Sequence, residues 1–135
     1  MAPRRFTLDE AQQMLPHLAS LLMQMQQRKQ QHDAFERQIE EIEERMAGNG
    51  RVLEAELNEA RQEMAKAAAQ VNSLLERLQA LGCELKDIDQ GLVDFRTVMD
   101  GREVYLCWKL GEASISWWHE LEAGFAGRQR LEERT

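Results

Sequence analysis

The stretch VNSLLERLQALGCELKDIDQGLVDF, residues 71–95, contains the point at which the chain changes its hydrophobic spacing. Before Gly82 the apolar residues recur at steps of three and four, which is the period of a helix. After Gly82 they alternate with polar residues, which is typical of a strand with one buried face. We therefore predict an α+β fold in which a long antiparallel helical hairpin, coiled-coil-like, packs on a C-terminal antiparallel β-meander of three to four strands.

The second helix of the predicted hairpin has a regular apolar seam. The residues of that seam are Leu53, Leu57, Ala60, Met64, Ala67, Val71, Leu74, Leu78 and Leu81. This unbroken alternation of four and three residues is the a/d pattern of a coiled coil. The segment AGNG, residues 47–50, ends the first helix, and Gly48 or Asn49 can take the left-handed cap. A short loop makes the two helices antiparallel, so we expect a hairpin over residues 6–81.

The first helix begins with a capping box. Thr7 and Glu10 have the T-x-x-E spacing in which each side chain bonds the other residue's backbone N–H. Pro16 lies inside the apolar stripe and removes one helical hydrogen bond. Because the stripe continues on both sides of it, we predict that Pro16 bends the helix without ending it.

The meander is predicted over residues 83–119. Its strands are expected at residues 83–88, 92–98, 102–110 and 114–119. Three short turns connect them: DQG at 89–91, DG at 100–101 and GE at 111–112. The DG dipeptide is a strong signal for a type I′ hairpin turn.

The lengths of these turns fix the register, and hence the side chains that face each other. The expected cross-strand pairs are Leu85–Phe95, Lys86–Asp94, Glu84–Arg96, Phe95–Leu106, Val93–Trp108, Asp94–Cys107, Trp108–Ile115 and Leu106–Trp117. One face of the sheet is then apolar and the other carries paired charges. We expect the apolar face to pack on the hairpin near Leu8, Ala11 and Leu15.

The bulk properties exclude several classes of protein. A chain of 135 residues is the size of one domain, which we predict over 1–135 with a tail at 120–135. The net charge of −7 argues against general nucleic-acid binding, which needs a basic surface. No apolar run is long enough to span a membrane, and the N-terminus has no secretion signal. Cys83 and Cys107 form no metal or redox motif, which favours reduced thiols in a cytoplasmic protein.

Asp94 and Cys107 are adjacent in the predicted register. A carboxylate beside a thiol can bind a metal, although a site needs three or four donors. The alternative is that Asp94 pairs with Lys86 across the strands and that Cys107 is only a small strand residue. We rank that alternative first and predict no metal and no cofactor.

The C-terminal segment offers further candidate ligand-binding residues. His119 precedes two acids, but a general base needs a partner and a pocket, and a histidine that caps a strand end is the simpler interpretation. Trp118 is expected on the outer face of the sheet, either at a protein contact or covered by residues 120–131 through Phe125. Glu112 is expected in a solvated turn. Arg128 can hold an anion or form a structural salt bridge.

Three stretches together resemble a known bacterial family. They are FTLDEAQQMLPHL near the start, DIDQGLVDF in the middle and GREVYLCWKLGEASISWWHELEAGFAGRQRL at the end. They resemble the uncharacterised family known as domain of unknown function 2203, with Arg130 at a position where that family's pattern has proline. The resemblance implies a small intracellular protein and supplies no activity and no catalytic residues.

The sequence therefore favours a non-enzymatic interaction or scaffold protein that acts through self-association, as a homodimer, or through a partner helix. The alternative is a small-molecule or metal-binding protein, possibly an enzyme, that uses the C-terminal motif. In that alternative the binding residues are His119, Glu112 and Arg128, and at lower rank Asp94 with Cys107.

Overall fold

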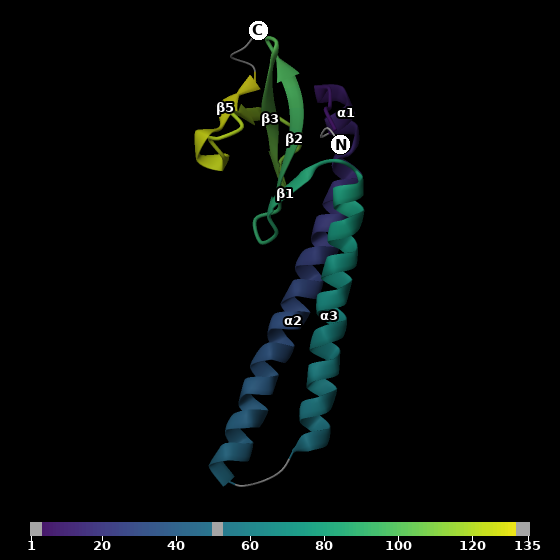
Figure 1. Cartoon of the computed structure of the whole chain (residues 1–135), viewed down its shortest axis with the longest axis vertical. Helices are drawn as coiled ribbons and strands as arrows, with labels where there is room; N and C mark the ends of the chain where they lie inside the picture. The colour runs from purple at the N-terminus through teal and green to yellow at the C-terminus, as the bar shows by residue number, and fades with distance from the viewer. Residues whose placement is uncertain (1–3, 50–52, 132–135) are drawn as a thin grey trace. The chain divides into compact units, whose positions relative to one another are not determined.

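The computed structural model describes residues 4–49 and 53–131 and divides into two compact units. One unit runs from the N-terminus to Met23 and continues from Leu75 onward, and the other is Gln24–Leu74. The helices are α1 (Leu8–Gln13), α2 (Leu15–Asn49) and α3 (Glu54–Ala80) (Figure 1). The strands are β1 (Glu84–Asp87), β2 (Leu92–Met99), β3 (Arg102–Lys109), β4 (Trp117–His119) and β5 (Gln129–Arg130), with a 3₁₀ turn η1 (Phe125–Gly127) before β5. They form one antiparallel sheet in the order β1-β2-β3-β4-β5, which confirms the α+β prediction.

The capping box at the start of α1 is present as predicted. The Thr7 hydroxyl accepts a hydrogen bond from the Glu10 backbone N–H at 3.1 Å. The Thr7 backbone N–H donates to Glu10 Oε1 at 2.8 Å. These reciprocal bonds satisfy two backbone donors that the helix itself cannot satisfy.

The prediction that Pro16 only bends the first helix is wrong, because the structure divides that helix at Met14 into α1 and α2. Met14 keeps a right-handed helical backbone, but its N–H donates to Ala11 O at 3.1 Å, which closes a tighter turn. Pro16 has no N–H to donate to the carbonyl four residues earlier, so the α-helical ladder is interrupted there.

The predicted left-handed cap at Gly48 or Asn49 is also wrong. Both residues lie inside α2, which extends to Asn49. Among the described residues, Asp100 is the only non-glycine residue with a positive φ. Asn49 therefore does not have a left-handed backbone and stays helical. Small and polar residues at a solvated helix end can stay helical without a left-handed cap, since water satisfies the last carbonyls. The remainder of the predicted loop, from Gly50, lies outside the described residues.

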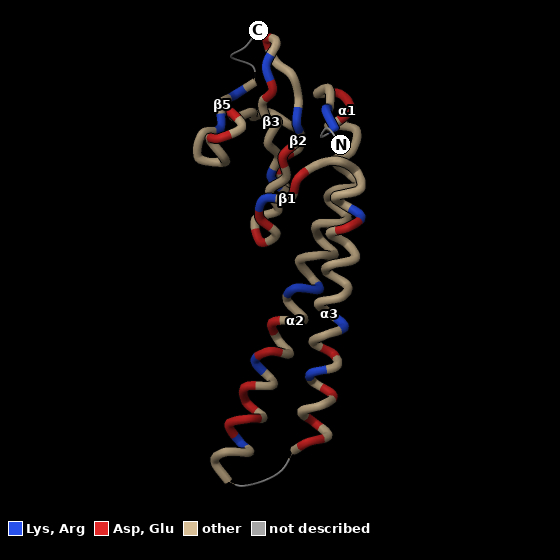
Figure 2. Tube along the Cα trace, in the orientation of Figure 1, with Lys and Arg blue, Asp and Glu red and all other residues tan. Residues whose placement is uncertain are grey.

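In the Gln24–Leu74 unit the buried residues of the predicted seam are Leu53, Leu57, Ala60, Ala67 and Leu74, whereas Met64 and Val71 are half-buried. Ile42 packs with Leu53, Leu57 and Ala60, and the partly buried Ile39 and Met46 pack against this cluster. Acidic and basic residues are interspersed along both helices in this unit (Figure 2). Two ion pairs, Arg45–Glu56 at 3.5 Å and Arg61–Glu43 at 4.0 Å, are more than half exposed and contribute little to stability. None of the described helices is long and apolar enough to cross a membrane.

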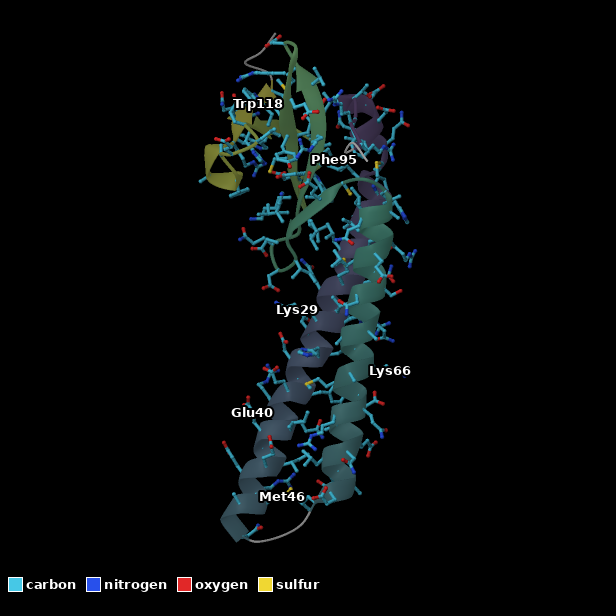
Figure 3. The ribbon with its side chains drawn as sticks, viewed as in Figure 1. Lys29, Glu40, Met46, Lys66, Phe95 and Trp118 are labelled. Carbon is cyan, nitrogen blue, oxygen red and sulfur yellow. The ribbon has the colours of Figure 1, made fainter. Side chains whose placement is uncertain are left out.

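In the other unit, β2 and β3 form the centre of the sheet. Their predicted register is confirmed, with Phe95 opposite Leu106 and Val93 opposite Trp108. The connecting turn has positive φ at Asp100 (53°) and Gly101 (80°), as a type I′ turn requires. Phe95, labelled on β2 in Figure 3, is fully buried and meets the Phe6 ring edge-on at a centroid distance of 5.3 Å. The sheet's apolar face is therefore its core face.

Contacts with the N-terminal segment hold that core face in place. The Phe6 N–H donates to Arg96 O at 2.7 Å. Of the three residues predicted to meet the sheet, Ala11 and Leu15 are buried, whereas Leu8 remains 38% exposed.

The predicted pairing of the first hairpin is wrong by two residues. Glu84 lies opposite Asp94 and Leu85 opposite Val93, with an irregularity between Leu85 and Asp87. The turn occupies four residues, 88–91, where three were predicted. A shift of two keeps every side chain on its predicted face, so only the partners change.

The predicted pairing of the third hairpin is wrong by one residue. Trp118 lies opposite Leu106 and Trp117 opposite Cys107. The GE turn does not form a tight hairpin, because the Glu112 carboxylate accepts the Lys109 backbone N–H at 2.7 Å and removes it from the ladder. A shift of one exchanges the faces, so Trp118 is buried in the core at 4% exposure and Trp117 lies on the outer face.

The two adjacent tryptophans provide a test of this register. Trp118→Ala removes a buried ring and is expected to cost about 3–5 kcal/mol of unfolding free energy. Trp117→Ala removes a half-exposed ring and is expected to cost about 1 kcal/mol, mainly through lost stacking with arginine. Urea denaturation followed by circular dichroism measures both values. A larger loss for Trp117→Ala than for Trp118→Ala would restore the register predicted from sequence.

Candidate functional site

Asp94 on β2 and Cys107 on β3 face each other directly, as predicted. Both are almost fully buried, at 2% and 1% exposure, although they lie on the outer face of the sheet. The Cys107 Sγ and a carboxylate oxygen of Asp94 lie within 4.8 Å of each other. The preferred sequence interpretation, in which Asp94 pairs with Lys86, does not describe the structure, because the Lys86 ammonium pairs with Glu84 at 3.0 Å.

His119 joins this pair from β4. The one-residue shift of β4 places His119 opposite Tyr105, on the same face as Cys107, and leaves its side chain 2% exposed. Its Nε2 lies 3.0 Å from Asp94 Oδ2, and its Nδ1 lies 2.8 Å from the Glu120 backbone oxygen. The Tyr105 ring packs beside the imidazole at a centroid distance of 5.3 Å. We call Asp94, Cys107 and His119 the buried trio.

The hydrogen-bond partners of His119 fix where its protons lie. A carbonyl oxygen can only accept, so Nδ1 carries a hydrogen and donates it to Glu120 O. In a neutral imidazole Nε2 then presents a lone pair to Asp94 Oδ2, which is also an acceptor when ionised. The 3.0 Å contact therefore requires one further proton, held either by the Asp94 carboxyl or by the imidazole.

Burial controls the acidity of the other two groups. It raises the pKa of the Asp94 carboxyl, and this effect outweighs the opposing effects of His119 and of the Cys107 hydrogen bond. Burial, reinforced by the charge of Asp94, raises the pKa of the Cys107 thiol to about 12. Cys107 is therefore a protonated thiol at neutral pH, which makes it a poor nucleophile.

The buried trio lies on the floor of a cavity of about 230 Å³. Its other lining residues are Lys86, Leu92, Tyr105, Leu121, Glu122, Gly124 and Phe125. Leu121, Glu122, Gly124 and Phe125 belong to the segment after β4, which folds back over the outer face before β5 pairs with β4. This covering segment accounts for the burial of polar groups that the sequence placed on a solvated face.

Glu112 and Arg128, predicted as ligand-binding candidates, do not line this cavity and instead hold the covering segment. The Arg128 guanidinium pairs with Glu112 Oε2 at 2.7 Å. It also stacks on the Trp117 ring at 4.6 Å and on the Phe125 ring at 4.7 Å. Arg128 therefore forms the structural salt bridge that was one of its two interpretations.

Trp118, the remaining candidate, is excluded from the outer face by its position in the core. The predicted folding back of residues 120–131 does occur, but the tryptophan that it covers is Trp117. Tyr105 was not among the predicted site residues. Its hydroxyl donates to Glu84 Oε2 at 2.8 Å, and the residue lines the cavity. Its alternation with Cys107 placed it on the outer face, but no signal marked that face as covered.

Because His119 carries its hydrogen on Nδ1, we expect two substitutions at position 94 to differ in their unfolding free energy. In Asp94→Asn the new amide can donate to the Nε2 lone pair, so we expect a change in unfolding free energy of less than about 1 kcal/mol. Asp94→Leu leaves Nε2 buried without a partner and is expected to cost about 1–3 kcal/mol more. Paired urea denaturation curves test this. Equal stability of the two variants would contradict the assigned proton on Nδ1.

The sequence model of one family covers nearly the whole chain. The family described as "Uncharacterized conserved protein (DUF2203)" matches residues 4–131. No curated protein and no solved structure matches the chain. A match of this extent, over the hairpin, the sheet and the covering segment, confirms the resemblance seen in the three motifs, and the chain belongs to the DUF2203 family.

Proposed function

We propose that this chain is a ligand-binding protein and that its ligand occupies the cavity above the buried trio. The observation that carries the proposal is the buried His119–Asp94 contact of 3.0 Å on the floor of that cavity. Concave sites with mostly apolar walls and a few convergent polar groups are the usual form of a small-molecule site. This geometry favours the second of the two functions that the sequence left open.

The cavity walls define the kind of ligand that fits. Leu92, Leu121 and Phe125 offer apolar contact. Lys86, whose ammonium also pairs with Glu84, and Glu122 supply one charge of each sign at the wall. A compact molecule with an apolar body and one polar or acidic group matches this lining. His119 has both ring nitrogens engaged within the protein, so it is not presented as a free general base. A binding role is therefore better supported than a catalytic one.

Two small aromatic probes test the cavity. Benzoate and its neutral counterpart benzyl alcohol are titrated into the ¹⁵N-labelled protein, and we expect saturable shifts at Tyr105, Cys107 and His119. Leu121→Glu places a charge in the apolar wall and is expected to weaken binding about tenfold, the equivalent of about 1.4 kcal/mol. Benzoate should bind more tightly than benzyl alcohol if Lys86 contributes.

Val98→Glu is the matched control for Leu121→Glu. Val98 is likewise a partly exposed apolar residue of the same unit, and it does not line this cavity. The Val98→Glu variant should leave probe binding unchanged. The absence of saturable shifts in the wild type with either probe, or equal losses in the two variants, would end the proposal.

Self-association is the second candidate function. The hairpin unit has a narrow core, because two helices bury only one face of each. A second copy would convert two helices into a four-helix coiled-coil bundle and cover more apolar surface. Against this, the large apolar residues that are most exposed among the described positions lie outside Gln24–Leu74.

Light scattering after size exclusion measures the oligomeric state directly. Self-association predicts a homodimer mass that falls toward the monomer on dilution. A uniform monomer at high micromolar concentration would contradict it and would leave the ligand proposal unaffected.

A cytoplasmic location remains part of the proposal. It is supported by two buried cysteines that are both free thiols, a pattern usual in reducing compartments. We do not expect nucleic acid as a partner, because the net charge is −7 and acidic and basic residues are interspersed along the described chain (Figure 2).

A further inference from the structure

We infer that the buried trio is a binding site for a divalent transition-metal cation of the zinc type. The inference rests on the proposed function, because the cation would lie on the floor of the same cavity. It adds the chemical class of the bound species, which the cavity walls alone do not give.

Three different donor atoms converge in the buried trio. A carboxylate oxygen of Asp94, the Cys107 Sγ and a ring nitrogen of His119 all lie within 4.8 Å of one another. They come from β2, β3 and β4, neighbouring strands whose ladder holds the backbones in place. Donors around a tetrahedral zinc ion are separated by about 3.5 Å, given bond lengths of about 2.0–2.3 Å. Small side-chain rotations therefore suffice to bring the three donors around one ion.

The imidazole of His119 has the orientation of a metal ligand. Metal-binding histidines usually donate their second ring N–H to a carbonyl or a carboxylate, which fixes the tautomer and aims the other nitrogen at the metal. His119 does this through Nδ1 and the Glu120 carbonyl at 2.8 Å. Its Nε2 lone pair is thereby directed at Asp94, at the centre of the trio.

Hydrogens now occupy the position that a cation would take. One proton is needed between Nε2 and Asp94 Oδ2, and the Cys107 thiol lies beside the same carboxylate, with all three donor atoms within 4.8 Å of one another. A divalent cation would replace both hydrogens. It would leave the carboxylate, the thiolate and a neutral imidazole as its ligands, so the cation and its ligands carry no net charge in a buried place. Burial disfavours an uncompensated ion, and this balance removes that cost.

The donor set selects the class of metal. Calcium and magnesium take oxygen ligands, whereas a mixed sulfur, nitrogen and oxygen set suits zinc and its first-row neighbours. The described residues supply no fourth donor to the cluster. Zinc sites with three protein ligands keep one position open, and here that position would face the cavity. A polar group of the cavity's ligand could then bind the metal directly.

Cobalt(II) is the probe that separates this inference from a purely structural hydrogen-bond cluster. The chelator-treated protein is titrated with CoCl₂ and its absorption spectrum recorded. We expect an equimolar end point, a thiolate-to-cobalt charge-transfer band in the near ultraviolet and visible bands of a tetrahedral ion. Added zinc should displace the cobalt, and zinc alone should raise the thermal unfolding temperature.

Three variants assign the donors. Cys107→Ser should abolish the charge-transfer band, whereas the matched control Cys83→Ser should retain it. Cys83 is also buried and free, but it bonds the Leu78 carbonyl and belongs to no ligand cluster among the described residues. Asp94→Asn preserves the hydrogen bond to His119 but removes the carboxylate. Substituting a residue that only supports a metal ligand typically weakens metal binding about 10–100-fold, and we expect a larger loss of cobalt affinity here.

Two outcomes would overturn the inference. One is a wild-type protein that shows no charge-transfer band and no zinc-dependent rise in unfolding temperature. The other is a band that survives in Cys107→Ser or is lost in Cys83→Ser. Either result can occur while benzoate and benzyl alcohol still bind in the cavity, so failure of the metal site is distinguishable from failure of the proposed function.

Discussion

The type I′ turn at Asp100–Gly101 fixes the register on which the rest of the sheet depends. Two consecutive positive φ angles set the pairing of β2 with β3, and that pairing places Asp94 directly opposite Cys107. Because side chains alternate, the same register gives β2 one face of Val93 and Phe95 toward the core. A slip of one residue would exchange the two faces and move a carboxylate into the apolar core. The turn therefore determines both the core and the position of the candidate site.

Burial on both faces distinguishes this sheet from a simple meander. Residues 104–108 of β3 are all buried, so β3 is covered on its outer face as well as on its core face. The cover on the outer face is the segment that Arg128 holds through Glu112, Trp117 and Phe125. By excluding water it raises the pKa values of Asp94 and Cys107 and leaves their polar atoms to satisfy one another. A buried polar cluster on a cavity floor is the result.

Local signals in the sequence predicted much of the fold. The change of period at Gly82 and the DG turn each act over a few residues, and both are confirmed. Six residues of the predicted seam, from Leu53 to Leu78, are buried. The errors in strand register arose where a side chain or an irregularity takes backbone hydrogen bonds away from the strand ladder. Glu112 takes the Lys109 N–H and shifts β4 by one residue, and the irregularity after Leu85 shifts β1 by two. The shift of β4 places His119 beside Asp94 and Cys107. Because this shift depends on a contact outside the strands, the pattern within each strand could not predict the buried trio.

The charge state of His119 connects the fold to its proposed chemistry. Its imidazole must hold a hydrogen on Nδ1 for the Glu120 carbonyl, which leaves Nε2 for a shared proton or a cation. Long-range ¹H–¹⁵N correlation spectroscopy of the histidine side chains measures this protonation directly. The account predicts that the Nδ1 of His119 carries a hydrogen. A neutral ring with the hydrogen on Nε2 and a bare Nδ1 would contradict it.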